Sequence, residues 1–274
     1  MDSGKSSSLR WLLCGALIGA GSILPGVSGG VLAVIFGIYQ PFMEILTAPR
    51  RGLTQYRQRL IPLAIGWCVG FLTFAKGIAL AFSSAETVTT WLFIGLICGT
   101  FPSLLRQAGK EGHPLHGWGS MLVCASASLA ALSSIHHISA IQAQPHFWWY
   151  NFCGILLGCG IIVPGLSTSP LLMALGLYEP LLEGLSNLDL PVLFSCVPGL
   201  LLTVLLLARL VNWLFRRHYA LAFHGIAGIV AASTVSIIPL DYTGVTEMLL
   251  SAAAAVSGGF LALLFSRLEE KSVS

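Results

Sequence analysis

The sequence has 274 residues, of which 9% are charged and 55% are hydrophobic, and its formal net charge is +3 at pH 7. Water-soluble domains carry about 25% charged residues, so this composition, with a mean hydropathy of +0.84, excludes a soluble globular protein. The small net charge gives no reason to expect a nucleic-acid partner. Several uncharged runs reach the roughly 18 residues that predict a membrane-spanning helix, and we therefore expect an all-α polytopic membrane protein.

The first apolar segment, at about residues 11–46, predicts a re-entrant helical hairpin. As a single helix its 36 residues would extend about 54 Å, much longer than the roughly 30 Å core of a bilayer. The sequence Pro-Gly-Val-Ser-Gly-Gly, which starts at Pro25, interrupts the segment, and Pro and Gly both end helices. The segment is also too long for the core of a removable signal peptide. We expect it to be retained as two half-helices that meet near the membrane midplane.

Three apolar segments follow this hairpin, and the same series then occurs again. The second series opens with another predicted hairpin, interrupted by Pro-Gly-Leu-Ser-Thr-Ser from Pro164. We therefore predict two hairpins and six full spans. The second hairpin lies at about residues 147–185, and the spans lie at about 60–82, 88–105, 118–138, 191–215, 219–239 and 245–266.

The two series are copies of one repeat. Pro25 corresponds to Pro164 at an offset of 139 (164 − 25 = 139), and the neighbouring Gly, Ser and Tyr residues of the two hairpins match at the same offset. A six-residue gap in the loop at 50–59 reduces the offset to 133 (139 − 6 = 133) for the spans that follow. The predicted repeats are residues 1–140 and 141–274.

The positive residues predict the orientation of the chain. Lys5 and Arg10 place the N-terminus in the cytoplasm by the positive-inside rule. If both hairpins return to the side from which they enter, the arginine-rich loop 50–59 and Arg267 fall on this same side, and Glu86 falls outside. Each half then crosses the membrane three times, so the halves have opposite orientations. Inverted repeats with broken helices are typical of transporters, whose substrates bind near the midplane between the repeats.

The turn of each hairpin predicts an anion site. A helix N-terminus offers unpaired backbone N–H groups and a partial charge of about half a unit. Glycine lets an anion approach the backbone, and hydroxyl groups add donors, so the turn suits phosphate or carboxylate. The alternative is that the hydroxyl residues only cap the second half-helix. The candidate substrate-binding residues are Gly26, Ser28, Gly29, Gly30, Gly165, Ser167, Thr168 and Ser169.

Two cations occupy corresponding positions inside the predicted spans. Lys76 and Arg209 are each the only charged residue of their span, at an offset of 133 (209 − 76 = 133). Because intramembrane charges are costly and most often functional, we predict that the two side chains neutralise one anion from opposite repeats. The alternative is that they snorkel to the interface.

Two further pairs of residues stand near the exits of the hairpins. Glu44 and Glu183 could carry protons if their carboxyl groups are desolvated; the alternative is that both lie at solvated helix ends. Tyr39 and Tyr178 are predicted to anchor the hairpins at the level of the lipid headgroups.

No catalytic or metal-binding constellation is evident in the sequence. The spans hold too few His, Asp and Glu residues for a nucleophile with a base, a carboxylate pair or a metal cluster. The seven cysteines lie in apolar runs without a Cys-x-x-Cys pair, which indicates small apolar packing residues. We therefore expect no enzyme activity, no metal and no cofactor.

The doubled hairpin sequence resembles the bacterial polyprenyl-phosphate transporter family over essentially the whole chain. The two Pro-Gly-x-Ser turns, each followed by Gly-x-Tyr, carry the resemblance. It implies flippase-type transport of undecaprenyl phosphate across the bacterial cytoplasmic membrane. The carrier lipid would thereby return to the inner face for the synthesis of peptidoglycan and other envelope polymers. It also implies that the hairpin residues named above hold the phosphate. The second turn has Thr-Ser-Pro where the first has Gly-Gly-Val, a departure from strict equivalence.

Two other functions stay open from the residues alone. One is a carrier or channel for a small soluble anion, and the other is a membrane-bound phosphatase of lipid phosphates. A lipid substrate needs a lateral opening between spans, whereas a soluble anion needs an aqueous path and a phosphatase would release phosphate. The coupling ion and the oligomeric state have no signature in the sequence.

Overall fold

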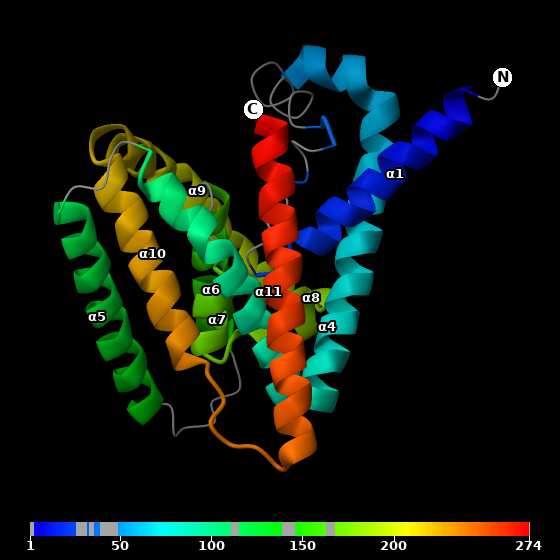
Figure 1. The fold of residues 1–274 in the computed structure, drawn as a ribbon. Helices are drawn as coiled ribbons and strands as arrows, with labels where there is room; N and C mark the ends of the chain where they lie inside the picture. The colour runs from blue at the N-terminus through cyan, green and yellow to red at the C-terminus, as the bar shows by residue number, and fades with distance from the viewer. Residues whose placement is uncertain are drawn as a thin grey trace.

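The structure is a computed structural model that describes residues 3–25, 32, 36–38, 49–110, 115–138, 146–162 and 168–273. Every regular element in these ranges is an α-helix (Figure 1). The helices are α1 (Ser3–Gly21), α4 (Pro49–Ala108), α5 (Leu115–Ile138), α6 (Phe147–Ile162), α7 (Ser169–Ala174), α8 (Tyr178–Ser186), α9 (Leu190–Arg217), α10 (Tyr219–Ser236) and α11 (Val245–Val273).

The apolar helices have the lengths of a polytopic membrane protein. Within the described residues, four helices are long and apolar enough to cross a membrane. A fifth span results if α8 and the start of α9, bent by 117° at their junction, form one broken span. Helix α4 contains two of the predicted spans, 60–82 and 88–105, because Ala85 adopts a non-helical conformation (φ −155°, ψ 67°) that kinks the helix between them. The other four predicted spans correspond to α5, α9, α10 and α11.

The second hairpin has one more break than the sequence predicts. A single half-helix is expected after the Pro-Gly-Leu-Ser turn, but two short helices, α7 and α8, occupy this place. The amide of Leu177 donates to the carbonyl of Leu172 and that of Gly176 to Met173, both at 2.9 Å, which is the Schellman arrangement that ends a helix. Gly176 has φ +67°, a left-handed conformation that favours glycine. Its repeat partner Gly37 has φ +70°.

Glycines bring α1 and the first part of α4 into close contact. A Cβ atom at Gly66 of α4 would overlap the carbonyl oxygen of Leu12 in α1. A Cβ atom at Gly15 of α1 would likewise overlap the carbonyl oxygen of Leu63 in α4. In a bilayer the hydrophobic effect does not drive helices together, because lipid tails are as apolar as the side chains. Small residues that let two backbones pack closely stabilise helix pairs instead.

The second half contains the same contact between α6 and α9. Gly199 of α9 faces the carbonyl oxygen of Asn151, and Gly154 of α6 faces that of Cys196. These positions are those of the first half shifted by 139 in the hairpin helix (154 − 15 = 139) and by 133 in the span (199 − 66 = 133). The repeated sequence therefore makes a repeated helix contact.

The third span of each half packs against the second span of the other half. Helix α5 lies along α10, and α11 lies along the second part of α4 (Figure 1). A Cβ atom at Gly228 of α10 would overlap the carbonyl oxygen of Met121 in α5, and one at Gly95 of α4 would overlap that of Ala255 in α11. Gly95 and Gly228 are repeat partners (228 − 95 = 133). The two halves are thus interlocked.

Gly66→Ala is expected to destabilise the protein, whereas Gly77→Ala is not. Both glycines lie inside α4, but a Cβ atom at Gly77 would meet nothing within 4 Å, whereas one at Gly66 would overlap backbone. Overpacking of this kind costs about 1–3 kcal/mol, and helix propensity favours alanine at both sites. Thermal unfolding of the two variants in detergent micelles measures the difference. Equal midpoints would show that the α1–α4 contact does not stabilise the fold.

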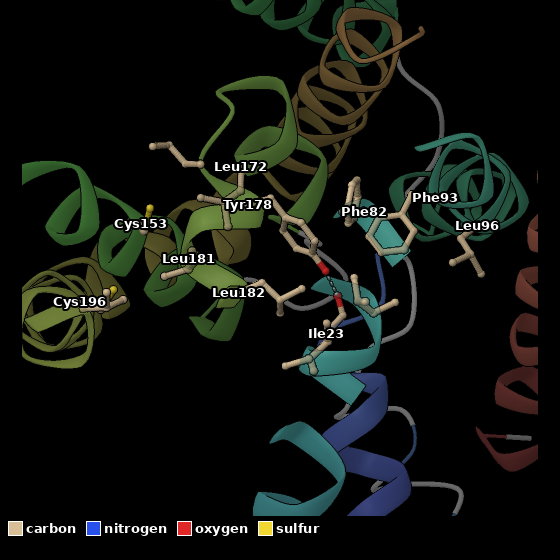
Figure 2. Close-up of a cluster of buried hydrophobic side chains, with 14 of the residues drawn as sticks. Ile23, Phe82, Phe93, Leu96, Cys153, Leu172, Tyr178, Leu181, Leu182 and Cys196 are labelled. Carbon is tan, nitrogen blue, oxygen red and sulfur yellow. Dashed lines mark hydrogen bonds between the residues drawn. The ribbon is translucent and has the colours of Figure 1, made fainter. Parts of the chain in front are cut away.

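The buried core joins the two hairpins to the kinked helix α4. Figure 2 shows Tyr178 of α8 directed towards Phe82 and Phe93, which lie on either side of the α4 kink. Leu172 and Leu181 extend the cluster through α7 and α8, and further members come from α6 and α9. The core therefore forms where helices of both predicted repeats meet.

Candidate functional site

The structure describes two of the eight predicted hairpin residues. Thr168 is the N-cap of α7 and Ser169 is its first residue, and both are half-buried. The Thr168 side chain makes no capping hydrogen bond, so the capping alternative does not account for its hydroxyl group. Helix α7 has only 6 residues, and its dipole is correspondingly weak. Any anion site here would depend chiefly on hydroxyl and backbone donors. The predicted residues Gly26, Ser28, Gly29, Gly30, Gly165 and Ser167 lie outside the described ranges.

Tyr178 is buried, so its predicted place at the lipid headgroups is wrong. Its side chain is 6% exposed, with ring centroids 6.0 Å from Phe82 and 5.7 Å from Phe93. The phenolic hydroxyl donates a 3.0 Å hydrogen bond to the carbonyl oxygen of Ile23 (Figure 2). A buried tyrosine needs such a partner for its hydroxyl. Ile23 comes two residues before the fully buried Pro25, so this bond ties the second hairpin to the chain that leads into the first turn.

Of the two predicted cations, the structure describes the side chain of Lys76 but not that of Arg209. Lys76 is exposed on α4, next to the fully buried Ala75. Arg209 lies in α9, and its side chain is outside the described part of the chain. The joint role of the two charges stays a prediction.

A cavity with two carboxylates lies at the kink of α4. Its volume is about 220 Å³, and Glu86 and Glu179 are the acidic residues among the described residues that line it. The other lining residues are Phe82, Thr90, Met173, Ala174, Gly176, Tyr178, Ser236 and Ile237. The walls of the cavity are thus formed by the kink of α4, the α7–α8 turn and the end of α10.

These carboxylates differ from the pair that the sequence singled out. Glu183 is exposed and does not line the cavity, and Glu44 lies outside the described ranges. Glu179 precedes Glu183 by one helical turn and has no acidic repeat partner, because position 40 (179 − 139 = 40) is Gln40. Glu86 was expected only as an outer loop residue. A comparison of the repeats therefore could not find this site. Among the described residues, no group of three or more His, Cys, Asp or Glu residues could hold a metal ion.

Comparison with known proteins gives a consistent result. A family model described as VCA0040-like, undecaprenyl phosphate translocase-like, matches residues 18–256. A polyprenyl-phosphate transporter of Vibrio cholerae serotype O1 is 25% identical over 256 residues, which cover 88% of this chain and 81% of that protein. A polyprenyl-phosphate transporter of Staphylococcus aureus is 22% identical over 275 residues, which cover 94% of this chain and 97% of that protein. No solved structure matches the chain.

Proposed function

Because the chain belongs to the VCA0040-like family of undecaprenyl phosphate translocase-like proteins, we propose that it moves a polyprenyl phosphate between the leaflets of the bacterial cytoplasmic membrane. Undecaprenyl phosphate is the proposed substrate, and return of this carrier lipid for envelope polymer synthesis is the proposed role. The observation that carries the proposal is the family match over residues 18–256, which covers most of the first hairpin segment, all of the second and the apolar helices up to the middle of α11.

The proposed phosphate site uses both hairpin turns as half-sites. Thr168 supplies a hydroxyl that is not used for capping, and the matching turn of the first hairpin supplies Ser28 and its neighbouring glycines. The hydrogen bond from Tyr178 to Ile23 supports this pairing, since it holds the approach to the first turn against the second hairpin. Lys76 and Arg209 are proposed to neutralise the phosphate charge from opposite repeats.

The proposed inverted arrangement suits a substrate that must face both leaflets in turn. The helix contacts of the two halves are related by constant sequence offsets, and the second spans of the halves, in α4 and α10, pack against each other. Alternating access in such folds comes from movement of one repeat against the other around a fixed site. The apolar tail of the lipid would stay in the bilayer, beside the exposed apolar faces of the spans.

Purified protein in liposomes is expected to move fluorescent undecaprenyl phosphate from one leaflet to the other. The assay follows the fraction of lipid that a membrane-impermeant quencher reaches, with protein-free liposomes as the control. The Ser28→Ala, Ser167→Ala double variant is expected to be slower, because two donors to the phosphate are lost. No movement above the protein-free rate would contradict the proposal. Uptake of inorganic phosphate instead would indicate a soluble-anion carrier, and release of phosphate from the lipid would indicate a phosphatase.

A further inference from the structure

Among the described residues, the charged side chains that line the cavity at the α4 kink are acidic. Glu86 and Glu179 line it, and no Lys, Arg or His of the described ranges does. Glu86 is exposed and so lies where the cavity opens, whereas Glu179 is half-buried. The volume of about 220 Å³ is room for several water molecules, since one occupies about 30 Å³ in the liquid. The cavity can therefore admit water and small cations to both carboxylates.

A buried hydroxyl group in the same cavity is available to bind. Thr90 is 7% exposed and lines the cavity, and its hydroxyl makes no hydrogen bond within the described part of the chain. The adjacent Thr89, by contrast, bonds to the carbonyl of Ala85 at 2.8 Å, and Ser236 bonds to that of Ala232 at 3.0 Å. A buried hydroxyl that gives up the usual helical partner loses free energy unless another group binds it. The Thr90 hydroxyl is thus a polar group that water or another occupant of the cavity can bind.

The chemistry of the lining selects a positively charged occupant. Two carboxylates in one partly enclosed site repel each other, and the free energy is lowered when they share a proton or bind a cation. A phosphate group would be repelled, so this cavity is distinct from the proposed phosphate site. Two further acidic residues lie on neighbouring elements: Glu183 on the exposed side of α8 and Glu247 at the start of α11. The lining residues from α7 and α10 are uncharged.

We propose that Glu86 and Glu179 form a shared proton-binding site, open to the outer side, whose loading drives the return of the lipid phosphate. This inference rests on the proposed function. In each cycle a proton from the outer solution would join the carboxylate pair and later leave towards the inner side. Tyr178 links this site to the hairpins, because it lines the cavity, precedes Glu179 directly and donates its hydrogen bond to Ile23. A change of charge at Glu179 therefore occurs beside the contact that joins the two hairpins.

Transport driven by a pH gradient tests the inference. The rate of movement of fluorescent undecaprenyl phosphate is measured in proteoliposomes with the outer buffer more acidic than the lumen, and again without a gradient. The wild-type protein is expected to be accelerated by the gradient, and to slow as the outer pH is raised, since the site is then empty of protons. For the Glu86→Gln and Glu179→Gln variants, the transport rate measured with the pH gradient should equal the rate of the wild-type protein measured without a gradient. Asp241→Asn, an exposed acid at the same predicted face, should keep the wild-type acceleration.

Further measurements distinguish a variant that fails to fold from a result that contradicts the inference. Glu179→Asp retains an ionisable group and should keep most of the acceleration. Infrared difference spectra of the wild-type protein during acidification should show a protonated carboxylic acid that Glu179→Gln lacks, a readout that does not depend on transport. Unchanged acceleration in both glutamine variants would overturn the inference, as would acceleration by a sodium gradient at equal pH alone. Loss of the acceleration in Glu183→Gln only would assign the role to Glu183. If the wild-type protein moves no lipid at all, the proposed function itself fails.

Discussion

Tyr178→Ala is expected to lower the thermal stability of the protein strongly and to abolish transport of the lipid. The side chain fills the space beside Phe82 and Phe93 in the core (Figure 2), and truncation of a buried aromatic ring costs about 3–5 kcal/mol. That is a large part of the 5–15 kcal/mol by which a typical domain is stable. The loss would fall where the helices of both repeats meet, so the hairpins would lose their common support. Unfolding midpoints in detergent and the liposome assay measure the two effects.

Tyr178→Phe separates the hydrogen bond from the packing of the ring. The phenylalanine ring fills the same space, but the carbonyl oxygen of Ile23 loses its donor. A buried acceptor left without a partner costs about 1–3 kcal/mol, so an intermediate midpoint is expected. Tyr242→Phe is the matched control, since Tyr242 is 38% exposed and should tolerate the change. If both tyrosine-to-phenylalanine variants behave like the wild type, the bond to Ile23 does not support the hairpins.

Lys76→Gln and Arg209→Gln are each expected to reduce transport of the lipid phosphate by about tenfold to a hundredfold. A hydrogen bond to a charged group is worth about 1.5–3 kcal/mol, and 1.4 kcal/mol corresponds to a factor of ten. Lys76→Arg keeps the positive charge and should retain more activity than Lys76→Gln. Stability should change little, since Lys76 lies on an exposed face of α4. Initial rates in the liposome assay provide the measurement.

Lys110→Gln is the control for this pair. Lys110 is also an exposed lysine, but it follows the end of α4 and lies outside the predicted spans. The Lys110→Gln variant should transport the lipid phosphate at the wild-type rate. Wild-type rates in both Lys76→Gln and Arg209→Gln would indicate that the two cations snorkel to the interface and do not bind the substrate.

Hydropathy and spacing were sufficient to locate most of the helices. A span in a bilayer must be about 20 apolar residues long, so the apolar runs predicted where α5, α9, α10 and α11 lie in the sequence. The repeat, aligned on Pro25 and Pro164, also anticipated that residues at constant offsets would have equivalent roles. The helix contacts at Gly66 and Gly199 follow this rule.

The features that the sequence did not predict depend on contacts between distant segments. Tyrosine near the end of an apolar run is most often at the membrane interface, and only the carbonyl of Ile23 and the two phenylalanine rings make Tyr178 a core residue. The break at Gly176 depends on a positive φ angle, which the residue type permits but does not require. Glu86 and Glu179 are 93 positions apart (179 − 86 = 93), so the cavity between them has no local signature.

The exchange of third spans between the halves has a consequence for biogenesis. Helix α5 leaves the ribosome long before α10, on which it packs, and the second part of α4 is made long before its partner α11. The face of α4 at Gly95 and Gly99 therefore stays without its partner helix until α11 has been synthesised. Insertion into the bilayer and tertiary assembly are thereby separated in time, and a shortened chain without α11 would present this face to chaperones and membrane proteases. The interlocked packing of these helices can therefore form only after α11 has been inserted.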